Sequence, residues 1–223
     1  MAERLTEYLR RKFDGIWEAQ HQHPFVRGVG DGTLALERFE FWLRQDYVFL
    51  IEYARLLALA TARSPDLETM VRFAKLVTET LETEMSLHRA YATEFGIECE
   101  ELERESPAPT TRAYTDFLLR VAAMGDFAEL VAALLPCIWG FSEIGQRLAK
   151  QPAPSEKRFA KWVAMYSSSE FAELAQWCRD LVDTLATGLP ERDVQKLETA
   201  FSTSSRYEWQ FWEMAWKTER WQV

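Results

Sequence analysis

The chain has 223 residues, of which 48% are hydrophobic and 13% aromatic; this is enough to bury a large core and excludes an intrinsically disordered protein. Its formal net charge of −9 repels phosphate backbones and argues against nucleic-acid binding. Its three cysteines are widely spaced and form no CxxC or Cys/His cluster, which argues against a disulfide framework and a zinc site.

Apolar residues recur every three to four positions along nearly the whole chain, and no stretch alternates polar with apolar residues. This periodicity predicts an all-α protein. Helix-breaking residues divide it into about eight helices. In chain order we expect helices near residues 2–20, 33–63, 66–95, 111–124, 127–144, 156–166, 169–187 and 191–221, with an irregular loop at 21–33, where a proline and three glycines occur, and a linker at 151–155.

We find no internal repeat, no low-complexity tract and no linker long enough to separate two domains. The sequence therefore predicts one domain over residues 1–223, a multi-helical bundle. The amino-terminal string MAERLTEYLRRKF has no apolar segment of the signal-peptide type, and no run of 18 uncharged residues occurs. We expect a soluble, cytoplasmic protein that does not enter a membrane.

Three reactive side chains occur in apolar surroundings. Cys137 follows Pro136 in the apolar stretch 127–144, and the proline is expected to kink that helix just before the thiol. Asp46 and Glu208 each share a helix face with apolar and aromatic residues. Singly, each has an ordinary explanation, because a buried cysteine packs like a small apolar residue and such acids are often exposed or paired with arginine.

Taken together with Tyr114 and Tyr166, the thiol and the two carboxylates favour a site for a flat, polar, nitrogen-containing ring. Aromatic side chains stack on such a ring, and carboxylates accept hydrogen bonds from its amino groups or protonate its nitrogens. Cys137 would then be a nucleophile, which requires either a lowered pKa of the thiol or an activated substrate. A carboxyl group in apolar surroundings can act as an acid near neutral pH.

Other site types have weaker support. Glu84 and His88, four residues apart, form the one inward candidate pair for a metal, and a hydrogen-bonded helix pair explains them better. His88 is also the one mid-helix histidine that could ligate haem. The sequence has no GxSxG string and no phosphate-binding loop. We therefore expect no metal and no cofactor.

Four strings, in order along the chain, resemble the TenA/thiaminase II family. They are HPFVRGVGDGTLALERFEFWLRQDY (residues 23–47), ETEMSLHRAYATEFGI (82–97), LLPCIWGFSEIG (134–145) and SSRYEWQFWEMAW (204–216). The resemblance implies a heme-oxygenase-like helical bundle that acts on the aminopyrimidine part of thiamin and of its breakdown products. The implied reaction hydrolyses 4-amino-5-aminomethyl-2-methylpyrimidine to the hydroxymethyl compound and ammonia, with cleavage of thiamin as an alternative.

The resemblance also implies roles for individual residues. Cys137 matches the nucleophile that adds to the pyrimidine ring, and Glu208 matches the acid/base at a ring nitrogen. Asp46 matches the carboxylate that orients the aminopyrimidine near the thiol, and Tyr114 and Tyr166 match tyrosines that line the pocket.

Two positions depart from the family pattern, because Phe49 and Phe141 stand where tyrosine is expected. Each lost hydroxyl removes a hydrogen bond with a net contribution of about 0.5–1.5 kcal/mol. Tyr47, two positions before Phe49, or an ordered water could replace the missing hydroxyl.

Two alternatives stay open: a non-catalytic aminopyrimidine-binding or regulatory protein of the same fold, and another helical-bundle activity such as an oxidase acting on a quinone-like ring. Family members are commonly tetramers, so the resemblance also implies a homotetramer.

Overall fold

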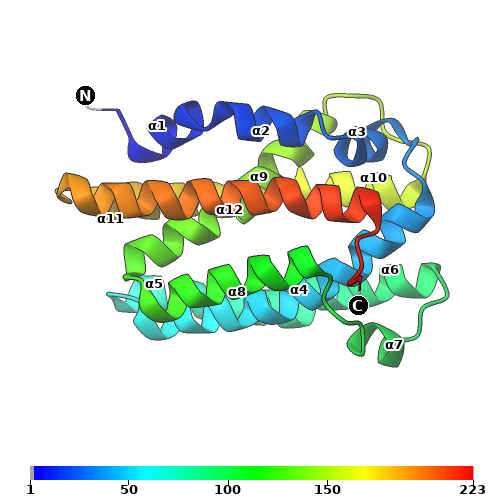
Figure 1. Ribbon diagram of the computed structural model, residues 1–223, viewed down its shortest axis with the longest axis horizontal. Helices are drawn as coiled ribbons and strands as arrows, with labels where there is room; N and C mark the ends of the chain where they lie inside the picture. The colour runs from blue at the N-terminus through cyan, green and yellow to red at the C-terminus, as the bar shows by residue number, and fades with distance from the viewer. Residues whose placement is uncertain (1–2, 223) are drawn as a thin grey trace. The chain divides into compact units, whose positions relative to one another are not determined.

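The structure is a computed structural model that describes residues 3–222. Over this range it contains α-helices, one π-helix and no strand, so the all-α prediction is confirmed (Figure 1). The elements are α1 Leu5–Lys12, α2 Asp14–His21, α3 Pro24–Asp31, α4 Leu36–Arg63, α5 Leu67–Thr78, the π-helix Glu79–Glu84, α6 Met85–Glu94, α7 Cys99–Glu103, α8 Pro109–Met124, α9 Phe127–Leu148, α10 Lys157–Tyr166, α11 Ser169–Ala186 and α12 Glu191–Lys217.

The helices form two compact units, neither of which is a continuous segment. The first unit consists of Met1–Leu34 with Ala128–Glu213, and the second consists of Ala35–Phe127 with Met214–Val223. The chain therefore passes from one unit to the other three times. A single domain over residues 1–223 stays a prediction.

In the first unit, α1 packs against α2 and α11, and α10 packs against α3 and α11. The predicted helix over residues 2–20 is divided at Phe13, whose φ of −107° and ψ of 20° end α1 and begin α2. Leu9 and Trp17, one from each half, are both fully buried. The apolar pattern thus continues across the break, which explains why periodicity alone predicted one helix.

The predicted irregular loop at 21–33 is wrong, because most of it forms α3. Pro24 occupies the first turn, where its missing N–H costs nothing, and the His23 side chain caps the helix by accepting from the Phe25 N–H. Gly32, with φ of 80°, ends it in a left-handed conformation. Gly30 allows close packing, since a Cβ there would lie 2.6 Å from the Leu148 side chain.

In the second unit, α4 is the central helix and packs against α5, α6 and α8; Figure 1 shows α8 running alongside it. The predicted helix over 66–95 is interrupted by the π-helix Glu79–Glu84, and the acidic stretch after it contains the short helix α7. A π-helix is rare and often occurs at functional sites, because its wider turn changes the direction in which later side chains point. Here it directly precedes α6, which carries His88.

α9 is continuous through Pro136 and carries Cys137. By length and composition it could cross a membrane, but 72% of its most apolar 18-residue window is buried inside the structure. The core helix of a soluble protein passes the same test, and that interpretation fits the burial of α9.

The contact between α9 and the end of α10 depends on a glycine. A Cβ on Gly145 would lie 2.4 Å from the carbonyl carbon of Tyr166 and 2.8 Å from the backbone nitrogen of Ser167. Backbone atoms cannot rotate away, so α10 must shift to admit a methyl group. We expect Gly145→Ala to lower the free energy of unfolding by about 1–3 kcal/mol, measured by urea denaturation.

The matched control is Gly15→Ala in α2, where an added Cβ has nothing within 4 Å. This variant should be neutral or more stable by up to about 1 kcal/mol, because alanine favours helix over glycine. Equal stability of the two variants would contradict the close approach at Gly145.

Candidate functional site

Cys137 is the exception in a buried run of α9. Every residue from 130 to 142 is buried except Cys137, which is partly exposed and is not in a disulfide. The sequence prediction of a thiol in an apolar helix is therefore correct, and the structure adds that this thiol is reachable. The residues on either side of it along α9 are buried and mostly apolar, so Cys137 is the position of this run that a ligand can reach.

Glu208 on α12 is 3% exposed. It lies one helical turn before Trp212, which is also buried. The ordinary explanation, that an acid on a predicted apolar face is in fact exposed, is excluded for this residue. A carboxyl group buried in this way is costly to keep without a function or a compensating partner.

An aromatic cluster in the first unit joins the helices that carry these two residues. The ring centroid of Phe141 lies 4.8 Å from that of Tyr166 and 5.1 Å from that of Trp212. Cys137 is one turn before Phe141 on α9, as Glu208 is one turn before Trp212 on α12. The structure thus gathers α9, α10 and α12 around one set of rings, and Phe141 is a central member of it.

Asp46 is on α4 in the second unit and is 5% exposed. Its Oδ2 lies 2.7 Å from Nε2 of His88, which is 1% exposed, while Nδ1 of the same ring lies 3.0 Å from the carbonyl oxygen of Glu84. The three residues come from α4, α6 and the end of the π-helix. Asp46 and His88 are buried and Glu84 is partly exposed, so the three form a largely buried polar group.

This group contains unusual acid–base chemistry. Burial, together with the negative charge of Asp46, raises the pKa of Glu84 to about 7, despite the opposing effect of His88. Burial also lowers the pKa of His88, but the hydrogen bond and charge of Asp46 outweigh it, so the pKa is raised above its usual value. Perturbed carboxyl and imidazole groups in one buried cluster are typical of functional sites.

Of the remaining predicted residues of the second unit, Phe49 and Tyr47 lie on different faces of α4, and Tyr114 lies on α8. Phe49 packs its ring 5.2 Å from that of Tyr114 on α8. Tyr47 instead lies under the guanidinium of Arg89, 5.7 Å from its ring centre. Residues two apart on a helix point in nearly opposite directions, so this arrangement gives no support to Tyr47 replacing the hydroxyl absent from Phe49.

The pairing of His88 did not follow from the sequence. Its spacing suggested a pair with Glu84 or a haem ligand, whereas its side-chain partner is Asp46, 42 residues earlier in the chain. The available signal was that Asp46 and His88 are both polar residues on apolar faces of long helices. Buried polar side chains usually form hydrogen bonds, often with one another.

Comparisons with known proteins agree with this picture. The model of the TENA/THI-4/PQQC family matches residues 10–218. The chain belongs to this family. An aminopyrimidine aminohydrolase of Halalkalibacterium halodurans is 49% identical over 214 residues, which cover 96% of each chain. The predicted resemblance to TenA/thiaminase II is thereby confirmed.

Solved structures support the fold. The TenA homologue from P. horikoshii OT3 superposes with a TM-score of 0.89 at 30% identity, covering 96% of this chain and 99% of the homologue. A domain with a heme oxygenase-like fold from Shewanella denitrificans has a TM-score of 0.73 at 15% identity, with 96% and 92% covered. The heme-oxygenase-like prediction is confirmed.

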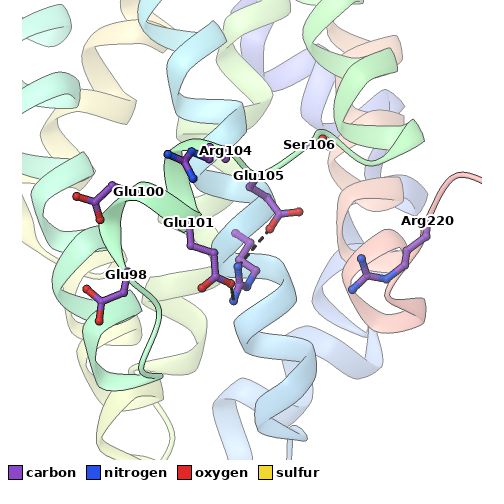
Figure 2. Close-up of a pocket in the computed structure, with 8 residues that line it drawn as sticks. Glu98, Glu100, Glu101, Arg104, Glu105, Ser106 and Arg220 are labelled. Carbon is purple, nitrogen blue, oxygen red and sulfur yellow. Dashed lines mark hydrogen bonds and ion pairs between the residues drawn. The ribbon is translucent and has the colours of Figure 1, made fainter.

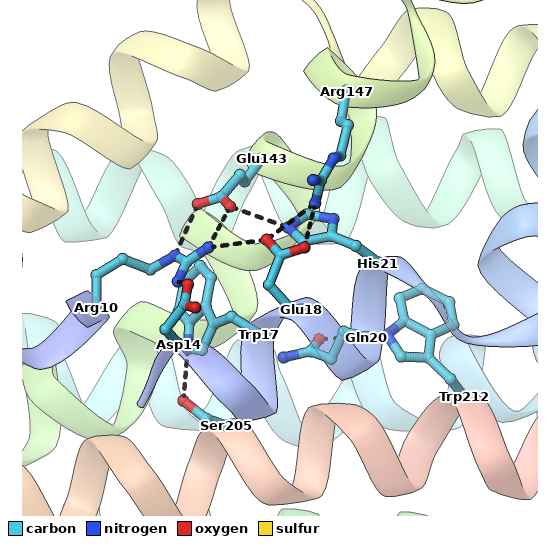
Figure 3. A network of polar contacts seen from close by, with 10 residues as sticks. All are labelled: Arg10, Asp14, Trp17, Glu18, Gln20, His21, Glu143, Arg147, Ser205 and Trp212. Atoms are coloured by element: carbon cyan, nitrogen blue, oxygen red, sulfur yellow. Dashed lines mark hydrogen bonds and ion pairs between the residues drawn. The ribbon is translucent and has the colours of Figure 1, made fainter. Parts of the chain in front are cut away.

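This TENA/THI-4/PQQC family member also has a polar network in its first unit (Figure 3). Ligand atoms of Glu18, His21 and Glu143 all lie within 4.8 Å of one another, as a metal site would require. However, Arg10 binds Glu143 at 2.8 Å and Arg147 binds Glu18 at 3.0 Å, so arginines already neutralise both carboxylates. An ion pair network explains this group without a metal.

The network should make the stability of the protein depend on acid pH. Burial would raise the pKa of Glu143, but hydrogen bonds from His21 and Arg10 outweigh it and lower the pKa from 4.5 to about 2. The ionised form therefore stabilises the fold above about pH 4.5, and this contribution, up to about 3 kcal/mol, is lost as the pH falls toward 2.

We expect Glu143→Gln to unfold more easily than wild type at pH 7 and to approach it near pH 2, measured by urea denaturation at a series of pH values. Glu170→Gln removes an exposed carboxylate on α11 and is the matched control. A constant difference between Glu143→Gln and wild type across this range would contradict the ion pair assignment.

An open hollow of about 640 Å³ lies on the second unit beside α7 (Figure 2). Its lining is Arg44, Glu98, Glu100, Glu101, Arg104, Glu105, Ser106 and Arg220. No aromatic ring and no predicted site residue belongs to this lining, and Arg44 is paired with Glu101 at 2.7 Å. A flat ring would find nothing to stack on here, so the hollow is a poor candidate for an aminopyrimidine site.

Proposed function

We propose that this chain is an aminopyrimidine aminohydrolase of thiamin salvage. It hydrolyses 4-amino-5-aminomethyl-2-methylpyrimidine to the 5-hydroxymethyl compound and ammonia. The observation that carries the proposal is a reachable thiol, Cys137, within a buried apolar helix of a chain that is 49% identical to an aminopyrimidine aminohydrolase over nearly its full length.

In the proposed mechanism the Cys137 thiolate adds to a carbon of the pyrimidine ring, and Glu208 protonates a ring nitrogen as the electrons move onto it. The electron pair then returns and expels ammonia from the methylene carbon, with a proton supplied to the leaving amine. Water adds to the exposed methylene and loses a proton. Finally the bond between carbon and sulfur breaks while the ring nitrogen returns its proton to Glu208, which restores the aromatic ring, the thiolate and the acid.

The other predicted residues would bind the ring. Asp46 accepts from its amino group, while Tyr114, Tyr166, Phe49, Phe141 and Tyr47 are the proposed lining. The buried aromatic contacts of Phe141 with Tyr166 and of Phe49 with Tyr114 support stacking roles in each unit. Thiamin is a second candidate substrate, with its thiazole as the leaving group instead of ammonia.

The cellular setting is part of the proposal. Three cysteines without a disulfide suit a reducing compartment, and we propose a cytoplasmic enzyme. We also propose a homotetramer, for which the support is the family resemblance. Light scattering on the purified protein measures the assembly directly, and a mass of one chain would contradict it.

The test of the function is incubation of the protein, after treatment with a chelator, with the aminomethyl compound and separately with thiamin. Chromatography with mass detection follows the hydroxymethyl product, and a coupled assay follows ammonia. Product in equal molar amount to ammonia is the expected result. Neither product despite saturable binding would overturn the proposal in favour of a non-catalytic binding protein, the alternative that Phe49 and Phe141 favour because both lack the hydroxyl of the family pattern.

A further inference from the structure

The contacts of His88 determine how its ring is protonated. Nδ1 lies 3.0 Å from the backbone carbonyl oxygen of Glu84. A carbonyl oxygen only accepts hydrogen bonds, so Nδ1 must carry a hydrogen and donate it. The neutral ring has one N–H, which means that Nε2 of a neutral His88 would be a bare acceptor.

The second contact then requires another proton. Nε2 lies 2.7 Å from Oδ2 of Asp46, and a hydrogen bond between them needs a hydrogen on one of the two atoms. Either His88 is an imidazolium that donates to an ionised Asp46, or a neutral His88 accepts from a protonated Asp46. The pair has no net charge in either case, and it holds one proton more than a neutral histidine beside a free carboxylate.

The surroundings favour the first of these states. The titratable group that faces the pair from the π-helix is Glu84, which acts on His88 as a negative charge; Asp46 faces it from α4. On α6 itself, Arg89 is directed onto the ring of Tyr47. Two acidic groups around one imidazole stabilise its charged form, and the pKa of His88 is raised as a result.

The geometry leaves one oxygen of Asp46 for a ligand. Oδ2 is held by His88, and the described part of the chain supplies no hydrogen-bond donor to Oδ1. An ionised carboxylate offers Oδ1 as an acceptor only, whereas a protonated one could present a donor there. The amino group of an aminopyrimidine donates hydrogen bonds, so it needs the ionised form.

We propose that His88 is a positioning residue for Asp46: as an imidazolium fixed by the Glu84 carbonyl, it holds Oδ2 and keeps Asp46 ionised so that Oδ1 accepts from the substrate amino group. The substrate part of this inference rests on the proposed function. The protonation state of His88 in the free protein does not, and it can be tested by itself.

The direct test is nitrogen NMR on wild-type protein with ¹⁵N-labelled histidine. The chain has three histidines, so comparison with His88→Gln assigns the signals of His88. We expect both ring nitrogens of His88 to carry hydrogen at pH 7, and we expect Asp46→Asn to convert Nε2 to the unprotonated form. A neutral wild-type ring with hydrogen on Nδ1 alone would overturn the proposal. If His88→Gln fails to fold, His21→Gln and His23→Gln assign the other two histidines and leave the third set of signals to His88.

Kinetics test the effect on substrate. His88→Gln keeps the size of the side chain and a donor group but removes the charge. We expect its kcat/KM to fall about 10- to 100-fold, mainly through a higher KM, as for loss of a hydrogen bond to a charged group. The pH profile of kcat/KM should also change, because the wild type loses the imidazolium of His88 as the pH rises through its raised pKa, whereas His88→Gln has no such group.

The matched control is His23→Gln. Like His88, His23 is buried and paired with an acidic side chain, here Glu213 at 3.1 Å, but it lies outside the proposed chemistry. Its pH profile should match that of wild type. If the wild type is inactive, the proposed function is wrong, and the NMR experiment alone tests the protonation state of His88. If the wild type is active and His88→Gln has the same KM and pH profile, the inference about His88 is wrong and the proposed function stands.

Discussion

Replacing Cys137 with serine is expected to lower the rate of ammonia release from 4-amino-5-aminomethyl-2-methylpyrimidine by at least about 10³-fold. The serine hydroxyl is much less acidic than the thiol and a weaker nucleophile toward a ring carbon, so the covalent step fails. Cys137 is partly exposed and the substituted atom is smaller, so the fold and the binding of substrate should be kept. Calorimetric titration with the hydroxymethyl product measures that binding.

The matched control is Cys99→Ser, which makes the same chemical change at an exposed, disulfide-free position in α7. It should retain full activity. If Cys137→Ser kept most of the wild-type rate, the assignment of the nucleophile would be wrong, and the reaction would have to proceed by direct attack of water on the methylene carbon.

Features that depend on a single stretch of the chain could be predicted from the sequence, and features that depend on tertiary packing could not. The buried positions of Asp46 and Glu208 and the apolar surroundings of Cys137 follow from helical periodicity, which a single stretch of sequence contains. The same reasoning placed α4, α8 and α10 within a few residues of their ends. It could not show that Cys137 is the accessible position within its run, because exposure depends on which helices pack around α9.

Three errors concerned where helices begin or change their backbone. Pro24 was taken to interrupt a helix, although a proline in the first turn favours one. The break at Phe13 and the π-helix Glu79–Glu84 both lie within apolar patterns that continue past them, so the periodicity did not reveal a change of backbone. The start of α3 is set locally, by Pro24 and the adjacent cap His23, whereas the other two features are not visible in the local pattern.

The hydrogen bond between Asp46 and His88 joins residues 42 apart, from two helices of one unit. No spacing rule connects such residues, since they meet only after α4 and α6 have packed. The family resemblance supplied the role of Asp46, but the residue that holds it came from the structure. The new information from the structure is therefore the position of His88 beside Asp46.

Glu208→Gln is expected to lower kcat by about 10²- to 10⁴-fold, the usual contribution of a general acid or base. Glutamine keeps the shape of the side chain and can still hydrogen-bond a ring nitrogen, but it cannot give or take the proton that accompanies attack by Cys137. KM should therefore change less than kcat. Steady-state kinetics with the aminomethyl compound, measured from pH 6 to 9, separate the two.

The control for this variant is Glu198→Gln on the same helix, where the carboxylate pairs with Lys12 at the surface, 2.6 Å away. Its kcat should equal that of wild type. A change confined to KM in Glu208→Gln would mean that Glu208 binds the ring without moving a proton. The acid would then have to be another group, and the partly exposed Glu84, whose pKa of about 7 suits proton transfer near neutral pH, would be the next residue to replace.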